Sequence, residues 1–500
     1  MTSAETGPRV EPVSTRPIIK KLPDGQTLNI RVVGETTLLP PRQTLRPAKP
    51  EKQIYDAIVV GAGLSGLSAA WRLRNKNILV LEREATPGGL AAQGQTANGR
   101  VTYARGAAYI TEPDGEVAEV YEDMGLTSIK KTAIPSPIDS YFYEGRLIKD
   151  IWEEPALLVL PPGFRAFKEK LQQLAKENYL DFDLPEEIPE KSKYLDHMTV
   201  AGFLKPYGPE VTEFLDSYCQ SALGGHATQV SALAFLQFYK DEIETRYTWP
   251  GGTGGASHHI VKKLLERNPR MFRTNSLVHE VLNTPDGVTV TYERDGQLYT
   301  VKARSAVMAV PLKASSKIVP EMPEDQKQLI AGIEYADYVL HEVFTPRDLF
   351  KETYDTWSTG RSFTDVIAGR WVETHGFKKK TGGPGILTVY MPLAPPDAAD
   401  ILAPEQVAEL AQKAAVELRD IVPRLAWEKK LTIESYRWPA SIHLTSPGYL
   451  TETAPKLGGS IGNIHFANNN MALPSFESSL LEGRHAANKI LKDLDSTENR

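Results

Sequence analysis

Three glycines at a fixed spacing are the first candidate for chemistry in this chain. Gly61, Gly63 and Gly66 follow the apolar run 57–60, and Glu82 ends the next apolar run, 78–81. In a dinucleotide-binding turn such glycines allow a tight turn, a close approach of the backbone to a pyrophosphate, and close packing of helix on strand. The helix start offers free N–H groups to phosphate, and the carboxylate accepts hydrogen bonds from ribose, which disfavours NADP. The spacing predicts a dinucleotide site at Gly61, Ala62, Gly63, Leu64, Ser65, Gly66, Glu82 and Arg83.

These residues need a strand, a helix and a second strand to hold them. The run 57–60 is predicted as a strand, 67–73 has helical spacing, and 78–81 is a second apolar strand, which together form a βαβ unit. With 500 residues the chain exceeds what one hydrophobic core usually supports. We therefore expect an α/β protein of more than one domain.

Further motifs follow in a defined order. Pro87-Gly88-Gly89 is followed by Gly106-Ala107-Ala108-Tyr109, and later come the glycine-rich stretch 249–255 and the strand pattern 277–288. The segment 464–469, with 474–477 and 482–487, closes the series. This order, from about residue 55 to 490, resembles the flavin amine oxidase family and its relatives, the protoporphyrinogen oxidases and polyene desaturases.

The resemblance implies FAD as the cofactor and a specific architecture. A Rossmann-like FAD-binding domain of the amine-oxidase type is expected from segments 54–130, 250–320 and 435–500, with an α+β substrate-binding domain inserted at 131–249 and 321–434. Residues 1–53 are expected to form an extended arm, part of which pairs with a sheet edge. The further FAD contacts implied are Gly88, Gly89, Leu90, Gly106, Ala107, Ala108, Tyr109, Val278, Asn468, Asn469 and Phe476.

The chain departs from the family pattern at several of these positions. Leu90 stands where members usually carry an arginine, and Asn468 and Asn469 replace a glycine and an acid. No cysteine occurs in the segment 438–443, where some relatives attach FAD covalently, so the flavin is expected to be non-covalent.

Three residues are candidates for the reaction centre. Aligned with the family, His341 stands where amine-oxidising members often place a lysine that holds a water at flavin N5. Phe476 would form one aromatic wall opposite the flavin, and Ser441 occupies the position of its aromatic partner. The alternatives are a histidine satisfied within a sheet and a phenylalanine in plain core packing.

Composition excludes several other classes. The net charge of −6 provides no basic field for nucleic acid, and the single Cys219 excludes an intramolecular disulfide and a cysteine-based metal cluster. The adjacent His258 and His259 point in different directions on a helix, so no metal site is expected. No apolar run reaches membrane-spanning length, and a cytoplasmic location is expected unless an export signal has been removed.

Three functions remain open at this stage. The first is an oxidase or dehydrogenase that transfers a hydride from an amine or amino acid to flavin N5. The second is a desaturase or isomerase of an apolar polyene, fatty acid or porphyrinogen, which would allow peripheral membrane contact. The third is a flavin-binding protein without catalysis. The substrate is expected to be a small molecule, its identity and the electron acceptor stay open, and the arm could support a homodimer.

Overall fold

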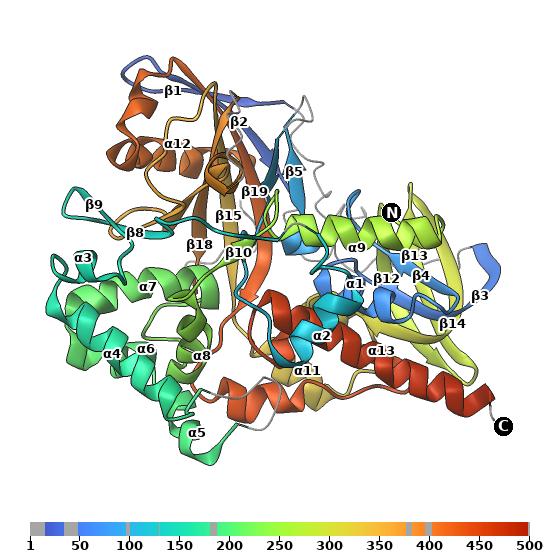
Figure 1. Cartoon of the computed structure of the whole chain (residues 1–500). Coiled ribbons are helices and arrows are strands. Elements are labelled where there is room, and N and C mark those ends of the chain that lie inside the picture. The colour runs from blue at the N-terminus through green and yellow to red at the C-terminus, as the bar shows by residue number, and fades with distance from the viewer. Residues whose placement is uncertain are drawn as a thin grey trace, which may run out of the picture.

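The chain folds around two β-sheets that lie side by side (Figure 1). A computed structural model describes residues 16–34, 49–96, 101–129, 131–180, 188–376, 383–395 and 403–498, with side chains described to residue 495. The predicted α/β class with a Rossmann-like unit is confirmed.

The first sheet has seven strands and carries the predicted βαβ unit. Its order is β11-β4-β3-β14-β13-β12, and β20 pairs with β14. Strands β3, β4, β11, β14 and β20 are parallel, whereas β12 and β13 form antiparallel pairs with their neighbours. The bounds are β3 (Lys49–Val60), β4 (Ile78–Leu81), β11 (Phe272–Arg273), β12 (Ser276–Thr284), β13 (Gly287–Arg294), β14 (Gln297–Met308) and β20 (Ile464–Phe466).

Strand β4 is buried along its whole length, as in a parallel sheet covered on both faces. Side chains alternate along the strands, so the two faces of the sheet pack into two separate hydrophobic cores. One face packs against α1 (Leu64–Arg72), α2 (Gly115–Asp123), α9 (Gly254–Arg267) and α13 (Phe476–Glu498). The other face packs near α10 (Leu312–Ile318) and α11 (Glu324–Ala331).

The second sheet has nine strands in the order β1-β2-β19-β15-β18-β17-β16-β8-β9. Every residue of β15 except one is buried, so this central strand is covered on both faces. The bounds are β1 (Ile18–Lys21), β2 (Thr27–Val33), β8 (Asp139–Tyr143), β9 (Arg146–Lys149), β15 (Tyr335–Thr345), β16 (Asp355–Ser358), β17 (Asp365–Ala368), β18 (Gly385–Leu393) and β19 (Lys430–His443).

Helices cover this sheet at opposite ends. Helix α12 (Pro404–Ile421), which the sequence predicts over 404–420, packs on β2, β15 and β19. A helical layer at the lower left of Figure 1 contains α3 (Glu154–Leu157), α4 (Pro162–Lys176), α5 (Glu190–Asp196), α6 (Val200–Leu204), α7 (Pro209–Leu223) and α8 (Ala232–Glu242). Two small sheets pair β5 (Gln93–Gln95) with β6 (Thr102–Ala104) and β7 (Thr132–Ala133) with β10 (Tyr247–Thr248).

Part of the N-terminal arm is a sheet edge. β1 and β2 form a hairpin, and β2 pairs in parallel with β19 of the same chain. Leu28, Ile30 and Val32 alternate into the core beside α12, which explains the alternating pattern of the segment 26–33. Residues 1–15 and 35–48 of the arm lie outside the described residues.

Two expected domain boundaries fall inside elements. The boundary between 53 and 54 lies within β3, which belongs to the seven-stranded sheet from Lys49 onwards. The boundary at 435 lies within β19, which runs to His443 in the nine-stranded sheet, and the chain next joins the seven-stranded sheet at β20. A strand cannot be divided between two sheets without losing its ladder, so the nine-stranded sheet holds the chain to His443.

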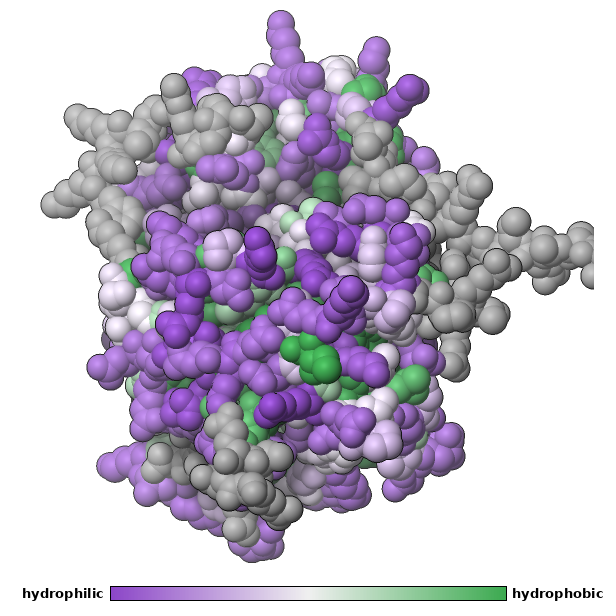
Figure 2. Space-filling model, turned by 90° about the vertical axis from the view of Figure 1, so that its right-hand side faces the viewer, coloured by the Kyte–Doolittle hydropathy of each residue, from purple (hydrophilic) through white to green (hydrophobic). Residues whose placement is uncertain are grey.

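The surface on the side of the seven-stranded sheet is mostly hydrophilic, with apolar residues in small separate groups (Figure 2). Within the described part of the chain, none of the helices combines the length and the apolar character that crossing a bilayer requires.

Candidate active site

The glycine turn between β3 and α1 is tightly packed except at one position. Gly61 has φ +97°, and a Cβ added there would lie 2.7 Å from the carbonyl oxygen of Ala309. A Cβ added at Gly66 would collide with the carbonyl oxygen of Gly61. At Gly63, by contrast, an added Cβ would meet no atom within 4 Å. The turn therefore faces open space only at the glycine that a pyrophosphate must approach.

Glu82 holds this turn in shape from the end of β4. Its carboxylate accepts hydrogen bonds from the backbone N–H of Ala62 at 2.7 Å and of Glu84 at 2.8 Å. Burial raises the pKa of Glu82, and these two backbone hydrogen bonds act in the opposite direction. Gly63 caps α1 without a side-chain hydrogen bond, and the first turn of α1 carries no acidic residue. This helix start thus suits an anion, and the residues present fit the diphosphate of a dinucleotide.

The other predicted cofactor segments converge on the same turn. The N–H of Gly88 donates to the carbonyl oxygen of Ala62 at 2.8 Å, and the N–H of Ala107 donates to that of Leu90 at 3.1 Å. Val278 lies on β12, next to the strand end that carries Glu82, because the N–H of Ser276 donates to the Glu82 carbonyl at 2.8 Å. Arg83, which follows Glu82, forms an ion pair with Glu84.

The two asparagines of the closing segment differ in their surroundings. The side-chain amide of Asn468 donates to the carbonyl oxygen of Val310 at 2.9 Å and accepts from the N–H of Asn470 at 2.9 Å. Asn469 lines a cavity instead. Asn468 therefore fixes the segment within the protein, and Asn469 is the one of the pair whose position opens to a ligand.

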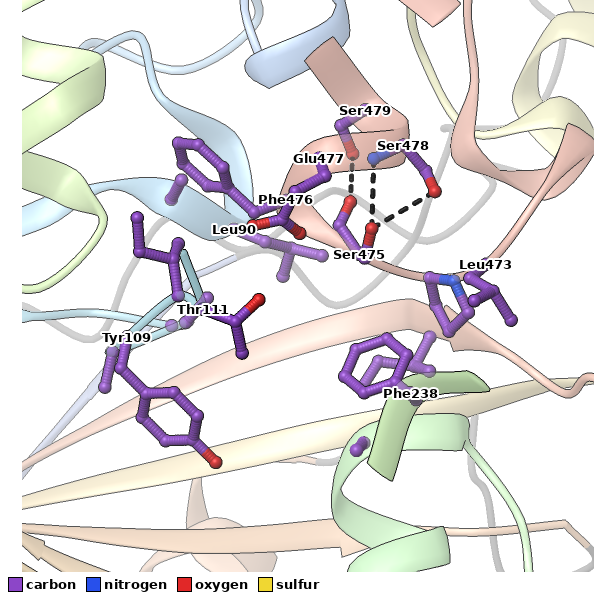
Figure 3. Close-up of a pocket in the computed structure, with 18 of the residues that line it drawn as sticks. Leu90, Tyr109, Thr111, Phe238, Leu473, Ser475, Phe476, Glu477, Ser478 and Ser479 are labelled. Atoms are coloured by element: carbon purple, nitrogen blue, oxygen red, sulfur yellow. Dashed lines mark hydrogen bonds between the residues drawn. The ribbon is translucent and has the colours of Figure 1, made fainter. Parts of the chain in front are cut away.

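A cavity of about 370 Å³ lies between the two sheets. The dinucleotide side contributes Leu64, Leu90 and the segment 106–109, and the residues before and at the start of α13 contribute the segment 473–479. In Figure 3 Phe238 of α8 faces the residues Ser475–Ser479 from the opposite side. The nine-stranded sheet and α7 complete the wall with Tyr218, Ser221, Tyr338, Leu340, Trp357, Asp365, Ile367, Tyr390, Trp438, Ser441 and Ile442.

Two of the three candidate reaction-centre residues line this cavity. Phe476 stands at the start of α13, with its ring centroid 6.1 Å from those of both Tyr121 and Trp249. Ser441 lies on β19, and its hydroxyl donates to the carbonyl oxygen of Ala336 at 3.2 Å.

His341 does not reach the cavity. Side chains alternate along a strand, and Tyr338 and Leu340 of β15 line the cavity, so His341 points to the other face. There its Nδ1 lies 2.8 Å from the hydroxyl of Ser435, and burial lowers the pKa of His341 to about 3. The structure therefore directs His341 away from the cavity, in contrast to the expectation that it faces the flavin. A shift of one residue along a strand moves a side chain to the opposite face of the sheet. Leu340 takes the cavity position.

Sequence reasoning missed a polar group on the cavity wall. The hydroxyl of Ser221 donates to Oδ1 of Asp365 at 3.0 Å and lies 2.8 Å from the hydroxyl of Tyr338. These three side chains come from α7, β17 and β15, and all line the cavity. Burial raises the pKa of Asp365 to about 7. The sequence shows only an acid at the start of the apolar run 365–368, which resembles a turn residue and does not indicate this group.

A fully buried arginine neighbours this group. The guanidinium of Arg246 forms ion pairs with Asp139 at 2.6 Å and Glu242 at 3.1 Å, and it lies 4.6 Å from the ring centroid of Tyr109. Glu242 lines the cavity, and burial raises its pKa to about 7. Among the described residues, no group of three or more His, Cys, Asp or Glu is arranged to hold a metal ion.

Solved structures share this fold. Cyclohexylamine oxidase from Brevibacterium oxydans superposes with a TM-score of 0.67 and 20% sequence identity, over 89% of this chain and 100% of that one. A CLA-producing fatty acid isomerase from P. acnes superposes with a TM-score of 0.63 and 16% identity, over 87% of this chain and 98% of that one.

Sequence comparison identifies the family. Oxidoreductase PigB from Serratia is 25% identical over 289 residues, which are 54% of this chain and 42% of PigB, so the match spans less than half of that relative. Flavin-containing amine oxidase A from Bos taurus is 22% identical over 482 residues, which are 90% of this chain and 88% of the relative. The model of the flavin containing amine oxidoreductase family matches residues 64–491. The chain therefore belongs to the flavin-containing amine oxidoreductases and is an FAD-dependent enzyme.

Proposed function

We propose that this enzyme oxidises a small amine. The observation that carries the proposal is the cavity, which joins the dinucleotide-binding segments to a wall that holds the buried carboxyl groups of Asp365 and Glu242. When bound, FAD supplies a hydride acceptor at N5 for the C–H bond next to the amine nitrogen. The neutral amine would lose a hydride, which is two electrons and one proton, from its α-carbon, and its nitrogen lone pair would turn the C–N bond into the double bond of an iminium cation.

The chain's own part is to position the reactants and to exclude water. We assign contact with FAD to the glycine turn, Glu82, the segments 88–90 and 106–109, Val278 and Asn469. Leu340, Trp438 and Ser441 would form the wall of the nine-stranded sheet that faces the reacting carbon, with Phe476 at its border. This assignment makes the seven-stranded sheet the FAD domain and the nine-stranded sheet the substrate domain.

Two hydrogen bonds tie the substrate wall to the flavin segment. The indole N–H of Trp438 donates to the carbonyl oxygen of Arg105 at 2.9 Å, and the hydroxyl of Tyr390 donates to that of Gly106 at 2.9 Å. A fixed distance between the two sides favours transfer of a hydride, because the donor carbon must stay in close contact with the acceptor.

The alternative is an apolar substrate. It is supported by the similarity in fold between this chain and a fatty acid isomerase. Against it stand the polar groups of the wall. Asp365 accepts a hydrogen bond from Ser221 and Glu242 from Arg246, but both line the cavity, and a hydrocarbon chain placed against them would remove water without supplying a further partner. Burial of a polar group without a hydrogen-bond partner costs about 1 kcal/mol to several kcal/mol. An amine, which is cationic in solution, supplies that partner.

Anaerobic reduction of the flavin tests the proposal. The purified holoenzyme is mixed without oxygen with a panel of primary and secondary amines, amino acids, unsaturated fatty acids and polyenes. We expect amines to bleach the flavin absorbance. If fatty acids or polyenes are converted and every amine leaves the flavin oxidised, the isomerase or desaturase reading replaces this one. The third reading, a protein without catalysis, would require that no compound changes and that no reductant reaches the flavin.

A further inference from the structure

Three oxygen atoms meet on the cavity wall at Asp365. Ser221 Oγ lies 3.0 Å from Asp365 Oδ1 and 2.8 Å from the hydroxyl of Tyr338. The three side chains come from different elements, and each lines the cavity. Thr364 Oγ1 also donates to Asp365 Oδ1, at 2.6 Å. The carboxylate and the hydroxyl oxygens of Ser221 and Tyr338 still offer three acceptors, the number of N–H donors on a primary ammonium.

Aromatic rings surround these oxygens. The ring centroids of Tyr338 and Tyr390 lie 6.1 Å apart, and those of Tyr218 and Trp357 lie 5.5 Å apart. All four rings line the cavity. The negative faces of aromatic rings attract a cation, more strongly where water is excluded.

The charges around this wall are unbalanced within the described residues. The carboxyl groups of Asp139, Glu242, Asp355 and Asp365 lie around a single guanidinium, that of Arg246. Arg246 makes its close ion pairs with Asp139 and Glu242, whereas Asp355 Oδ2 is 4.0 Å from it. A second cation would reduce the cost of ionising the remaining acids in this low-dielectric site.

Asp355 gives an independent sign of a missing partner. It is completely buried, and neither of its carboxylate oxygens accepts a hydrogen bond from the described residues. It lies on the same face of β16 as Trp357, and it pairs across the sheet with Ile367, and both of these residues line the cavity. Its side chain is therefore directed to the cavity side of the sheet.

The distance to the flavin segment is set by strand spacing. Trp357, Asp365, Tyr390 and Leu340 form one row across β16, β17, β18 and β15. Neighbouring strands are about 4.8 Å apart, so Asp365 lies roughly 10 Å from Leu340 along this row. Between them the hydroxyl of Tyr390 reaches Gly106 of the flavin segment. A short chain can thus extend from the flavin side to Asp365.

We propose that Asp365, Ser221 and Tyr338 form a subsite for a second ammonium group, so that the substrate is an amine with a second primary amine at the far end of a chain long enough to span this row. The proposal rests on the proposed amine oxidation and specifies its substrate class. The second ammonium donates to the three oxygens, and the amine at the other end lies at the flavin.

Matched amine pairs test this subsite on the holoenzyme. The ratio of kcat/KM for flavin reduction is measured for 1,6-diaminohexane against hexylamine and for 1,8-diaminooctane against octylamine, with 1,2-diaminoethane as a probe too short to span the row. We expect the longer diamines to exceed their monoamines by at least about tenfold, the usual effect of pairing a buried charge. Asp365→Asn should reduce this ratio about tenfold or more.

A matched control and a binding measurement accompany the kinetics. Asp295→Asn changes the same residue type at an exposed turn with φ +52°, which asparagine tolerates, and should leave the ratio unchanged. Calorimetry on the dithionite-reduced holoenzyme, which cannot turn over, should show the same loss of diamine affinity in Asp365→Asn. If Asp365→Asn does not fold, Tyr338→Phe, which keeps the ring, should lower the ratio by a smaller factor.

The outcomes separate the two proposals. If the wild-type enzyme oxidises diamines no better than monoamines, or if Asp365→Asn leaves the ratio and the diamine affinity unchanged, the subsite is overturned while amine oxidation stands. If no amine of either class reduces the flavin, amine oxidation itself fails.

Discussion

The hydroxyl of Tyr390 donates a hydrogen bond to the carbonyl oxygen of Gly106 at 2.9 Å. Tyr390 lies on β18 of the nine-stranded sheet, and Gly106 belongs to the segment that approaches the glycine turn through Leu90. Burial raises the pKa of Tyr390 well above its ordinary value, so the hydroxyl stays a donor throughout the neutral range. This bond connects the substrate wall to the cofactor side.

Tyr390→Phe removes that bond and keeps the ring. The unpaired carbonyl oxygen should cost about 1 kcal/mol of stability, and the loosened flavin segment should slow flavin reduction several-fold. Stopped-flow absorbance under anaerobic conditions measures the rate, and Tyr194→Phe, at an exposed helix position, is the control. An unchanged rate in Tyr390→Phe would mean that the bond does not align the reactants.

Gly63→Ala separates cofactor binding from folding. Its added methyl group meets no protein atom within 4 Å, so the thermal midpoint should stay close to that of the wild type. The methyl group would occupy the space that a pyrophosphate needs, and FAD affinity should fall by about tenfold or more. Fluorescence titration of the apoprotein with FAD measures this, with Gly459→Ala as a control at another open glycine. Equal FAD affinity in both variants would place the diphosphate elsewhere.

His341→Gln tests the placement of this histidine outside the cavity. The pKa of His341 is lowered to about 3 by burial, so the imidazole is neutral at working pH, and the pH profile of flavin reduction should not change. Loss of its contact with Ser435 should lower the free energy of unfolding by about 1–3 kcal/mol. Leu340→Ala, in the neighbouring position that lines the cavity, should instead alter the flavin spectrum. A pH profile that shifts only in His341→Gln would contradict this placement.

Asp365 should make stability depend on pH in the absence of substrate. Its pKa rises from an ordinary 3.8 to about 7 because of burial. The folded state therefore keeps a proton that the unfolded state has lost, and this group reduces stability as pH rises from about 4 to about 7. Asp365→Asn lacks this effect. The difference obtained by subtracting the wild-type thermal midpoint from that of Asp365→Asn should therefore be more positive at pH 8 than at pH 5. If this difference in midpoint is the same at pH 5 and pH 8, or is smaller at pH 8, Asp365 ionises with its ordinary pKa in the folded protein.

The parts of the protein that follow from local sequence were predictable. The glycine turn, Glu82 and the helix at 404–421 each have a signal within a few residues, namely spacing or period. The orientation of His341 could not be predicted, because alignment to a family position leaves an uncertainty of one residue, and one residue decides which face of a strand a side chain occupies. The group at Asp365 had no local signal, because Ser221 is 144 residues away in sequence and the two meet only through the packing of α7 on the sheet.

The most direct test of the central claim is the rate of anaerobic flavin reduction with an amine and with the same amine carrying deuterium at both α-positions. If hydride leaves the α-carbon for the flavin in this cavity, the amine bleaches the flavin and deuterium slows the bleaching several-fold. An isotope-independent rate, or a flavin that no amine reduces, would contradict the account.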